Sequence, residues 1–226
     1  MGELTLMVIS GIALAAHFMT WIESLYLTTV AASTTLVSTY PIFTLAMGRL
    51  IGERVGKRSM IGTLTAFLGI VLITAPEFYV SMKTLIGDLL ALAGAVSGAV
   101  YFLIGRFIRV RASLATYTVP VYGVSALTTL IVGLILHTRF WPYPPYTWFY
   151  ILMIVLGPML LGHTLLNYSL RYSRAITVTT STLGEPIGAS LLALAIFHQV
   201  PSTLTVIGIA VTLLGIYMVI SEELHG

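Results

Sequence analysis

The sequence has very few of the residues on which soluble enzymes and disulfide-rich proteins depend. It contains no cysteine, which excludes disulfide bonds and thiol chemistry. Only 8% of its 226 residues are charged, whereas soluble domains carry roughly 25%. Hydrophobic residues make up 58% of the chain, and no soluble fold of this length could bury so much apolar surface. The chain is therefore predicted to lie in a membrane.

Signatures of nucleotide-binding and metal-dependent enzymes are also missing. Gly56-Lys57 resembles the end of a phosphate-binding loop, but Ile51 stands where an earlier glycine is required. The sequence has no His-Glu-x-x-His motif and no other metal-ligand spacing. The net charge of +3 is explained by topology signals and contacts with anionic lipid. We therefore expect no metal, no cofactor, no catalytic group and no nucleic-acid partner.

Long hydrophobic runs predict about eight membrane-spanning helices. A helix needs about 20 apolar residues to cross a bilayer. The first run has neither a basic leader nor a small-residue cleavage site, so it is interpreted as a span and not as a signal peptide. Short links join the spans into one all-α polytopic membrane domain. The expected spans are residues 4–27, 29–51, 58–75, 84–106, 113–136, 148–171, 176–197 and 202–220.

The placement of Lys and Arg predicts the orientation. If the N-terminus is cytoplasmic, nine of the eleven basic residues lie inside and two, Lys83 and Arg139, lie outside. This asymmetry follows the positive-inside rule, so both termini are expected in the cytoplasm and the protein in the cell membrane. The nine inner residues are Arg49, Arg54, Lys57, Arg58, Arg106, Arg109, Arg111, Arg171 and Arg174.

Residues 16–75 and 162–221 are two copies of one pattern. Four residues of the first copy recur 146 positions later, and one proline recurs 145 positions later. These pairs are His17 and His163, Tyr26 and Tyr172, Gly62 and Gly208, Gly69 and Gly215, and Pro41 and Pro186. The two copies must face opposite ways. Inverted repeats on hydrophobic helices are typical of secondary transporters, which bind substrate between the copies.

Polar residues inside the spans are candidates for the substrate site, because polar groups are costly in lipid. His17 and Trp21 lie one helical turn apart on one face, and His163 and Asn167 occupy the matching places of the second copy. Two readings of the histidines stay open. They line a central cavity, where imidazole could bind substrate or relay protons, or they donate hydrogen bonds to backbone carbonyls of neighbouring helices. Tyr101 and Tyr122 are weaker candidates, which would supply aromatic walls of the cavity.

Glu185 is the strongest single candidate for a substrate-binding residue. It lies near the middle of the seventh expected span beside Pro186, and its counterpart beside Pro41 is Tyr40. Desolvation disfavours an ionised carboxylate at that depth, so Glu185 could bind a proton or a substrate amine. The alternative is a neutral structural carboxyl that hydrogen-bonds to an adjacent helix. Glu23 lies toward the outer end of its span, points away from the His17 face and ranks lower.

The repeated prolines and glycines predict mechanical features. Pro41 and Pro186 lack an N–H and would kink their helices, which frees the carbonyls of Val37 and Thr182 to bind substrate. The kinked helices are also candidates for gates. The repeated glycines are interpreted as close-packing seams. Gly94-x-x-x-Gly98 is either the face of a homodimer or a packing face within the monomer.

Taken with their order and spacing, several motifs resemble the EamA-type repeat of the drug/metabolite transporter superfamily. They are Ala16-His17-Phe18, Trp21-Ile22, Ser24-Leu25, Ala31-Ala32-Ser33, Pro41-Ile42-Phe43, Gly52-Glu53-Arg54, Gly69-Ile70, Tyr172-Ser173-Arg174-Ala175, Glu185-Pro186 and Gly215-Ile216. The resemblance implies ten spans in two inverted five-helix repeats around a central cavity. It implies transport of metabolites, often amino acids or related amphiphiles, and export in many members.

The sequence departs from that pattern in its first copy. Residues 1–76 match three helices of a repeat, and residues 84–221 match a complete repeat of five. We therefore expect a drug/metabolite transporter fold without its first two helices, which would be encoded upstream or supplied by a partner.

The function expected from these features is secondary transport of small organic metabolites by alternating access, with protons as the default coupling ion. Membrane lipid and the substrate are the expected partners, and a homodimer stays open. Two other classes are weighed beside a carrier. A non-transporting assembly protein that needs a partner would explain the three-helix first copy. An intramembrane enzyme would need paired catalytic groups, whereas Glu185 is the only deep carboxylate.

Overall fold

A computed structural model describes residues 2–50, 52, 55–74, 82–198, 200 and 202–225. Within these residues the chain is helical and has no β-strand. The predicted all-α polytopic membrane fold is confirmed. Five helical segments of the described part are long and apolar enough to cross a membrane: α1 (Glu3–Leu27), α5 (Met82–Arg109), α6 (Leu114–Ile135), α7 to α8 (Pro145–Ser169) and α11 (Thr203–His225).

The remaining expected spans include one short helix and two helices that are interrupted near their middles. The short helix is α4 (Lys57–Thr74). The first interrupted span consists of α2 (Val30–Val37) and α3 (Tyr40–Leu50). The second consists of α9 (Ala175–Ser181), the 3₁₀ turn η3 (Thr182–Gly184) and α10 (Glu185–Phe197). Local capping fixes where some helices begin. The Thr29 and Ser113 hydroxyl oxygens accept the backbone N–H groups of Ala32 and Thr116 at 3.0 and 3.1 Å, as N-caps do.

A change of helical pitch precedes one of the repeated histidines. The segment α7 (Pro145–Ile154) continues through the π-helical turn η2 (Val155–Gly162) into α8 (His163–Ser169). Pro158 lies inside the π-helical turn, where its missing N–H interrupts the normal hydrogen-bond ladder. His163 is therefore the first residue of a short helix that follows an irregular turn.

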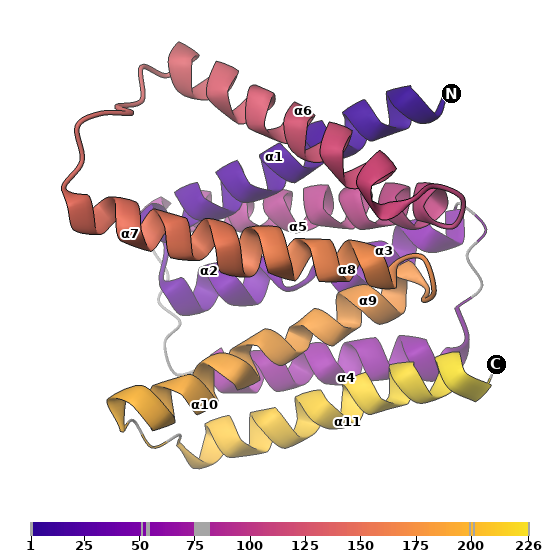
Figure 1. The fold of residues 1–226 in the computed structure, drawn as a ribbon. Coiled ribbons are helices and arrows are strands. Elements are labelled where there is room, and N and C mark those ends of the chain that lie inside the picture. Colours follow the sequence, from indigo (N-terminus) through magenta and orange to yellow (C-terminus); the bar gives the residue numbers. More distant parts are fainter. Residues whose placement is uncertain are drawn as a thin grey trace.

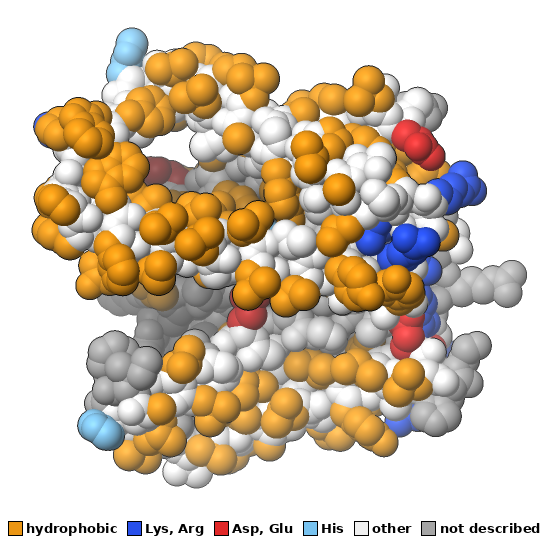
Figure 2. All heavy atoms as spheres, viewed as in Figure 1, with side chains coloured by type: hydrophobic (Ala, Val, Ile, Leu, Met, Phe, Trp, Pro, Cys, Tyr) orange, Lys and Arg blue, Asp and Glu red, His pale blue; other side chains and the backbone are white. Residues whose placement is uncertain are grey.

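The helices form two groups with the repeat-equivalent α4 and α11 on one side and α1, α5 and α6 on the other (Figure 1). The segments α2 to α3 and α7 to α10 connect these groups. Both chain ends lie at one end of the bundle, and most of the Lys and Arg side chains visible in Figure 2 gather at the same end. This arrangement follows from an even number of passes.

The glycines of the repeat meet each other between α4 and α11. A Cβ atom added to Gly62 would lie 2.7 Å from the carbonyl oxygen of Gly215, and one added to Gly208 would lie 2.7 Å from that of Gly69. Side-chain atoms do not approach a backbone oxygen so closely, so only glycine permits this contact. The repeat glycines therefore form a seam that joins the last helix of one copy to the last helix of the other.

A second close contact joins α1 to α5 within the monomer. A Cβ atom on Gly98 would lie 2.9 Å from Nδ1 of His17, and one on Gly94 would lie 3.1 Å from Oγ1 of Thr20. The Gly94-x-x-x-Gly98 face is therefore covered by α1, as one of the two readings of this motif expected.

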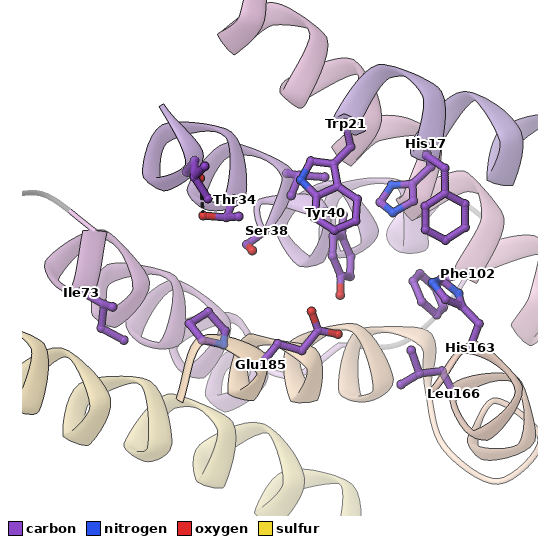
Figure 3. Close-up of a pocket in the computed structure, with 14 residues that line it drawn as sticks. His17, Trp21, Thr34, Ser38, Tyr40, Ile73, Phe102, His163, Leu166 and Glu185 are labelled. Carbon is purple, nitrogen blue, oxygen red and sulfur yellow. Dashed lines mark hydrogen bonds between the residues drawn. The ribbon is translucent and has the colours of Figure 1, made fainter. Parts of the chain in front are cut away.

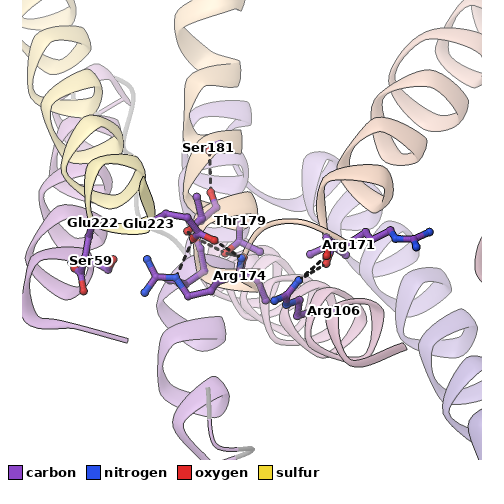
Figure 4. Close-up of polar contacts among 12 residues, drawn as sticks. Ser59, Arg106, Arg171, Arg174, Thr179, Ser181, Glu222 and Glu223 are labelled. Carbon is purple, nitrogen blue, oxygen red and sulfur yellow. Dashed lines mark hydrogen bonds and ion pairs between the residues drawn. The ribbon is translucent and has the colours of Figure 1, made fainter. Parts of the chain in front are cut away.

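Acidic residues of α11 bind α9 and α4 at the end of the bundle where the chain ends lie (Figure 4). The Glu223 carboxylate accepts from the Arg174 guanidinium and from the Arg174 backbone N–H, each at 2.9 Å, and also from the Thr177 hydroxyl. The neighbouring Glu222 accepts from the backbone N–H of Ser59. These contacts hold three helices together at this end.

Candidate functional site

A central cavity of about 440 Å³ lies between the two interrupted spans. Side chains from α1, α2, α3, α4, α5, α8 and α10 line it, so both copies of the repeat contribute to its walls. Figure 3 shows these side chains converging on one space between the helices. Ligand pockets in proteins commonly enclose about 300 to 1,000 Å³, so this volume suits a small organic molecule.

The two helix interruptions place equivalent residues in this cavity. The helix α2 ends at Val37, and α3 begins again at Tyr40, directly before Pro41. In the second copy the 3₁₀ turn ends at Gly184, and α10 begins at Glu185, directly before Pro186. Tyr40, Glu185 and Pro186 line the cavity. The sequence therefore located both interruptions, and the residue that precedes each proline faces the candidate site.

One prediction about these prolines is wrong in detail. Pro186 was expected to leave the carbonyl of Thr182 free for substrate. The backbone N–H of Glu185 donates to that carbonyl instead, because the chain tightens into a 3₁₀ turn that satisfies the oxygen at i+3. The Thr182 carbonyl is therefore not a free substrate ligand in this conformation.

Glu185 presents an unpartnered carboxylate to the cavity. Its side chain is exposed to the open space, and no hydrogen bond or ion pair to it is found among the described residues. Figure 3 shows the carboxylate and the Tyr40 hydroxyl pointing toward one another. The Tyr40 hydroxyl itself bonds to the Thr182 hydroxyl. Glu185 lies in the first turn of α10, where the helix dipole favours negative charge.

The two repeated histidines line the cavity but differ in their hydrogen bonds. Nδ1 of His17 donates to the Gly94 carbonyl at 2.8 Å, so His17 combines both readings that the sequence left open. Nδ1 of His163 is buried and has no hydrogen-bond partner among the described residues. The Phe18 ring lies edge-on to each imidazole, with ring centroids 5.1 Å apart in both pairs. His17 is thus anchored, whereas His163 retains a free ring nitrogen.

Aromatic rings supply most of the remaining wall. The Trp21 ring lies 6.0 Å from that of His17, and its buried indole Nε1–H finds no acceptor in the part of the chain that the structure describes. Tyr40 stacks on Phe102 at 5.6 Å, and Phe102 stacks on His163 at 6.4 Å. An unpaired buried donor is costly, and a substrate oxygen would satisfy the Trp21 N–H.

Three residues of the predicted site lie behind the cavity wall. Asn167 is fully buried, and its amide donates to the hydroxyl of Tyr101, to the hydroxyl of Tyr122 at 3.2 Å and to the carbonyl of His163 at 2.8 Å. Tyr101 is 1% exposed, and neither tyrosine lines the central cavity. This network holds the first turn of α8 against α5 and α6. It therefore positions His163 without reaching the central space.

Sequence reasoning did not select Phe18, Tyr40 or Phe102 as site residues. The repeat carried a signal for Tyr40, since it is the counterpart of Glu185. No sequence signal marked Phe18 and Phe102, because an aromatic residue in a hydrophobic span is normally interpreted as part of the hydrophobic core. Among the described residues, no group of three or more His, Asp or Glu side chains could hold a metal ion.

Comparisons with known proteins agree with this architecture. The sequence model of the EamA-like transporter family matches residues 2–75 and 85–221. An uncharacterized transporter of Archaeoglobus fulgidus is 24% identical over 227 residues, which cover 98% of this chain and 76% of that protein. A crystal structure whose title gives no function has a TM-score of 0.78 and 17% identity, and the match covers 99% of this chain and 87% of that one. The structural likeness concerns the fold alone.

Proposed function

Since this chain belongs to the EamA-like transporter family, we propose that it is a secondary transporter of small organic metabolites that binds its substrate in the central cavity. The observation that carries the proposal is the central cavity, which residues of both sequence copies line and which has a helix interruption on either side. Secondary transporters place substrate sites at such discontinuous helices.

The polar groups of the cavity favour a substrate that carries both an amine and an oxygen acid. The Glu185 carboxylate has no partner among the residues that the structure describes and would bind an ammonium group. The Trp21 indole N–H has no acceptor within the described part of the chain and would donate to a carboxylate oxygen. Phe18, Tyr40 and Phe102 would contact an apolar side chain. Amino acids and related amphiphiles combine these features, and the cavity volume of about 440 Å³ suits them.

The proposed mechanism is alternating access about the two interruptions. The α4 and α11 helices are locked together by the glycine seam, so they form a rigid element. The α2 to α3 and α9 to α10 segments have breaks at which the halves can reorient. Protons are the proposed coupling ion, because Glu185 and His163 are titratable groups that face the substrate space.

The proposed orientation places both chain ends in the cytoplasm of the cell. It is supported by the nine basic residues that the sequence assigns to that side, of which Arg54 lies outside the described residues. It is also supported by the Lys and Arg side chains that gather in Figure 2 at the end of the bundle where the chain ends lie. The positive-inside rule relates such an asymmetry to the cytoplasmic face.

One observation favours a second candidate, an assembly protein that needs a partner to become a carrier. None of the residues of α7 and η2 is buried. The equivalent helix of the first copy, α1, packs along α5 and α6 and buries residues such as Leu14 and Ala15. In this version, residues 1–76 form a partial first repeat, and two further helices cover α7 and η2. A catalytic role has less support, because the central cavity contains one carboxylate only among the described residues.

Flux measured in sealed proteoliposomes tests the proposal. Vesicles that contain the purified chain would be loaded with a mixture of labelled amino acids, and release would be followed for each component. The proposal expects release of a subset, abolished by Glu185→Gln, with empty vesicles as background. Release that is no faster than from empty vesicles, for every component and in both directions of the gradient, would favour the assembly protein.

A further inference from the structure

A second and larger cavity of about 1190 Å³ lies beside the central one. Its walls come from α1, α6 and η2, with contributions from α5, α8 and the α6–α7 loop. Figure 2 shows this face of the molecule hollowed between α6 and α7, with acidic side-chain atoms visible inside the hollow. We call it the lateral cavity. It shares two lining residues with the central cavity, Phe18 and His163.

The lining of the lateral cavity is apolar with a single charge. Most of the surface comes from side chains such as Leu14, Ile22, Leu130 and Met159. Glu23 is the one charged residue among the described lining residues, and no Lys or Arg is among them. The Glu23 side chain is exposed, and no ion pair or hydrogen bond to it is found in the described part of the chain. The cavity thus presents one unpaired negative charge beside a large apolar surface.

Glu23 lies near the end of α1 and lines the lateral cavity together with Thr138 and Phe140 of the α6–α7 loop. The apolar lining extends from there toward η2 and ends at the Phe18–His163 contact, with ring centroids 5.1 Å apart. A ligand that fits this space has its charged group at one end. Its apolar body points along α6 toward the partition with the central cavity.

We propose that the lateral cavity is a binding site for an amphiphilic amine, a molecule with one cationic head and a long or bulky apolar body. The head pairs with Glu23 and the body lies between α6 and η2. Both of these elements expose apolar residues to their surroundings, including Leu134 at 58% and Leu156 at 47%. A ligand dissolved in the lipid therefore reaches the site sideways, between the helices.

Charge and size distinguish this ligand from two alternatives. A phospholipid carries a phosphate, and no Lys or Arg is among the described residues that line the cavity to pair with it. A free amino acid suits the smaller central space of about 440 Å³ and would leave most of the 1190 Å³ lateral space unfilled. A cation of high apolar content matches both the lone carboxylate and the extent of the apolar wall. This proposal concerns ligand binding only, so it does not depend on the transport function proposed above.

Binding of radiolabelled dodecyltrimethylammonium to the protein in nanodiscs of uncharged lipid tests this site, with empty nanodiscs as background. Dodecanol, which has the same chain without the charge, is the matched ligand control. Glu23→Gln is expected to weaken binding of the cation by about tenfold or more, and Glu23→Asp to retain it. Glu3→Gln is the matched protein control, because Glu3 lies in the same helix and lines neither cavity. Ala126→Trp, which fills the cavity from α6, is expected to lower the number of bound cations.

Three outcomes would overturn the proposal. The first is equal affinity of the parent and the folded Glu23→Gln variant for the cation. The second is saturable binding of dodecanol as tight as that of the cation. The third is loss of cation binding in Glu185→Gln but not in Glu23→Gln, which would place the cation in the central cavity. Absence of flux with intact Glu23-dependent binding would contradict the transport function and leave this site standing.

Discussion

Glu185 is the residue whose environment most directly suggests a role in binding substrate or a proton. A structural carboxyl in a membrane helix has hydrogen-bond partners, since an unpaired polar group in that setting is costly. Glu185 has none among the described residues and faces open space. We therefore propose a functional role for Glu185 in place of a structural one.

Replacement of Glu185 by glutamine separates these readings. Glu185→Gln keeps the size and hydrogen-bonding capacity of the side chain and removes its charge. We expect loss of transport, or of its pH dependence, with a free energy of unfolding within about 0.5 kcal/mol of the parent. Flux and thermal unfolding of one preparation check both parts. Normal, pH-dependent flux would remove Glu185 from the site and leave the histidines as titratable candidates.

The two histidines should respond differently to the same substitution. His17→Phe removes the hydrogen bond to the Gly94 carbonyl and is expected to lower stability by about 1 kcal/mol. His163→Phe breaks no side-chain hydrogen bond to a described residue, because Nδ1 has no partner there. It is expected to weaken substrate binding with a smaller loss of stability. Thermal shift with and without substrate measures both effects. Equal losses of stability would contradict the assigned roles.

At the scale of the helices, the glycine seam explains how two copies of the repeat stay joined. The approach of Gly215 to α4 leaves no room for a side chain, since a Cβ atom there would lie 2.4 Å from the Gly62 carbonyl oxygen. Gly123 on α6 is a matched control, because a Cβ atom there would meet nothing within 4 Å.

Alanine at these two glycines should therefore have opposite effects. Gly215→Ala is expected to destabilise the protein by about 1 to 3 kcal/mol through overpacking. Gly123→Ala is expected to be neutral or to stabilise it by about 0.5 to 1 kcal/mol, since glycine is the poorer helix former. Thermal unfolding of both variants in one detergent compares them. A neutral Gly215→Ala would show that the seam is looser than the structure has it.

Helix interruptions could be predicted because their cause is local. Pro41 and Pro186 lack a donor wherever they lie, so their positions in the sequence determined where the spans break. The packing of Gly94 and Gly98 could not be decided from sequence. The same small-residue face serves a partner helix within the chain or in another molecule, and only the position of α1 distinguishes the two.

Sequence reasoning could predict only those site residues that the repeat or their charge marked. His17, His163 and Glu185 were found because charge or pairing made them conspicuous, and all three line the cavity. Asn167 shares a helix face with His163, yet it is turned into a buried network with Tyr101 and Tyr122. The π-helical turn before α8 and the packing of α5 set that rotation, and neither can be read from the residue spacing.

At the scale of the whole molecule, the account predicts the topology. Because the chain has no cysteine, single cysteines can be introduced and labelled without a background. Positions 57 and 111 are expected to react with a membrane-impermeant thiol reagent only from the cytoplasmic side, and position 139 only from outside. Position 111 is preferred to 109 because Arg109 is buried, with Nε bound to the Asn167 carbonyl at 2.9 Å. Labelling of position 57 from outside would reverse the orientation.

The central claim is that the cavity between the two copies opens to each side of the membrane in turn. Ser38 lines that cavity at the first interruption, so a single cysteine at position 38 reports its accessibility. The decisive measurement is the labelling of Ser38→Cys by an impermeant thiol reagent in right-side-out and in inverted vesicles, with position 57 as a one-sided control. The account predicts labelling of position 38 from both sides, slowed by substrate. Labelling from one side alone, with or without substrate, would contradict alternating access through this cavity.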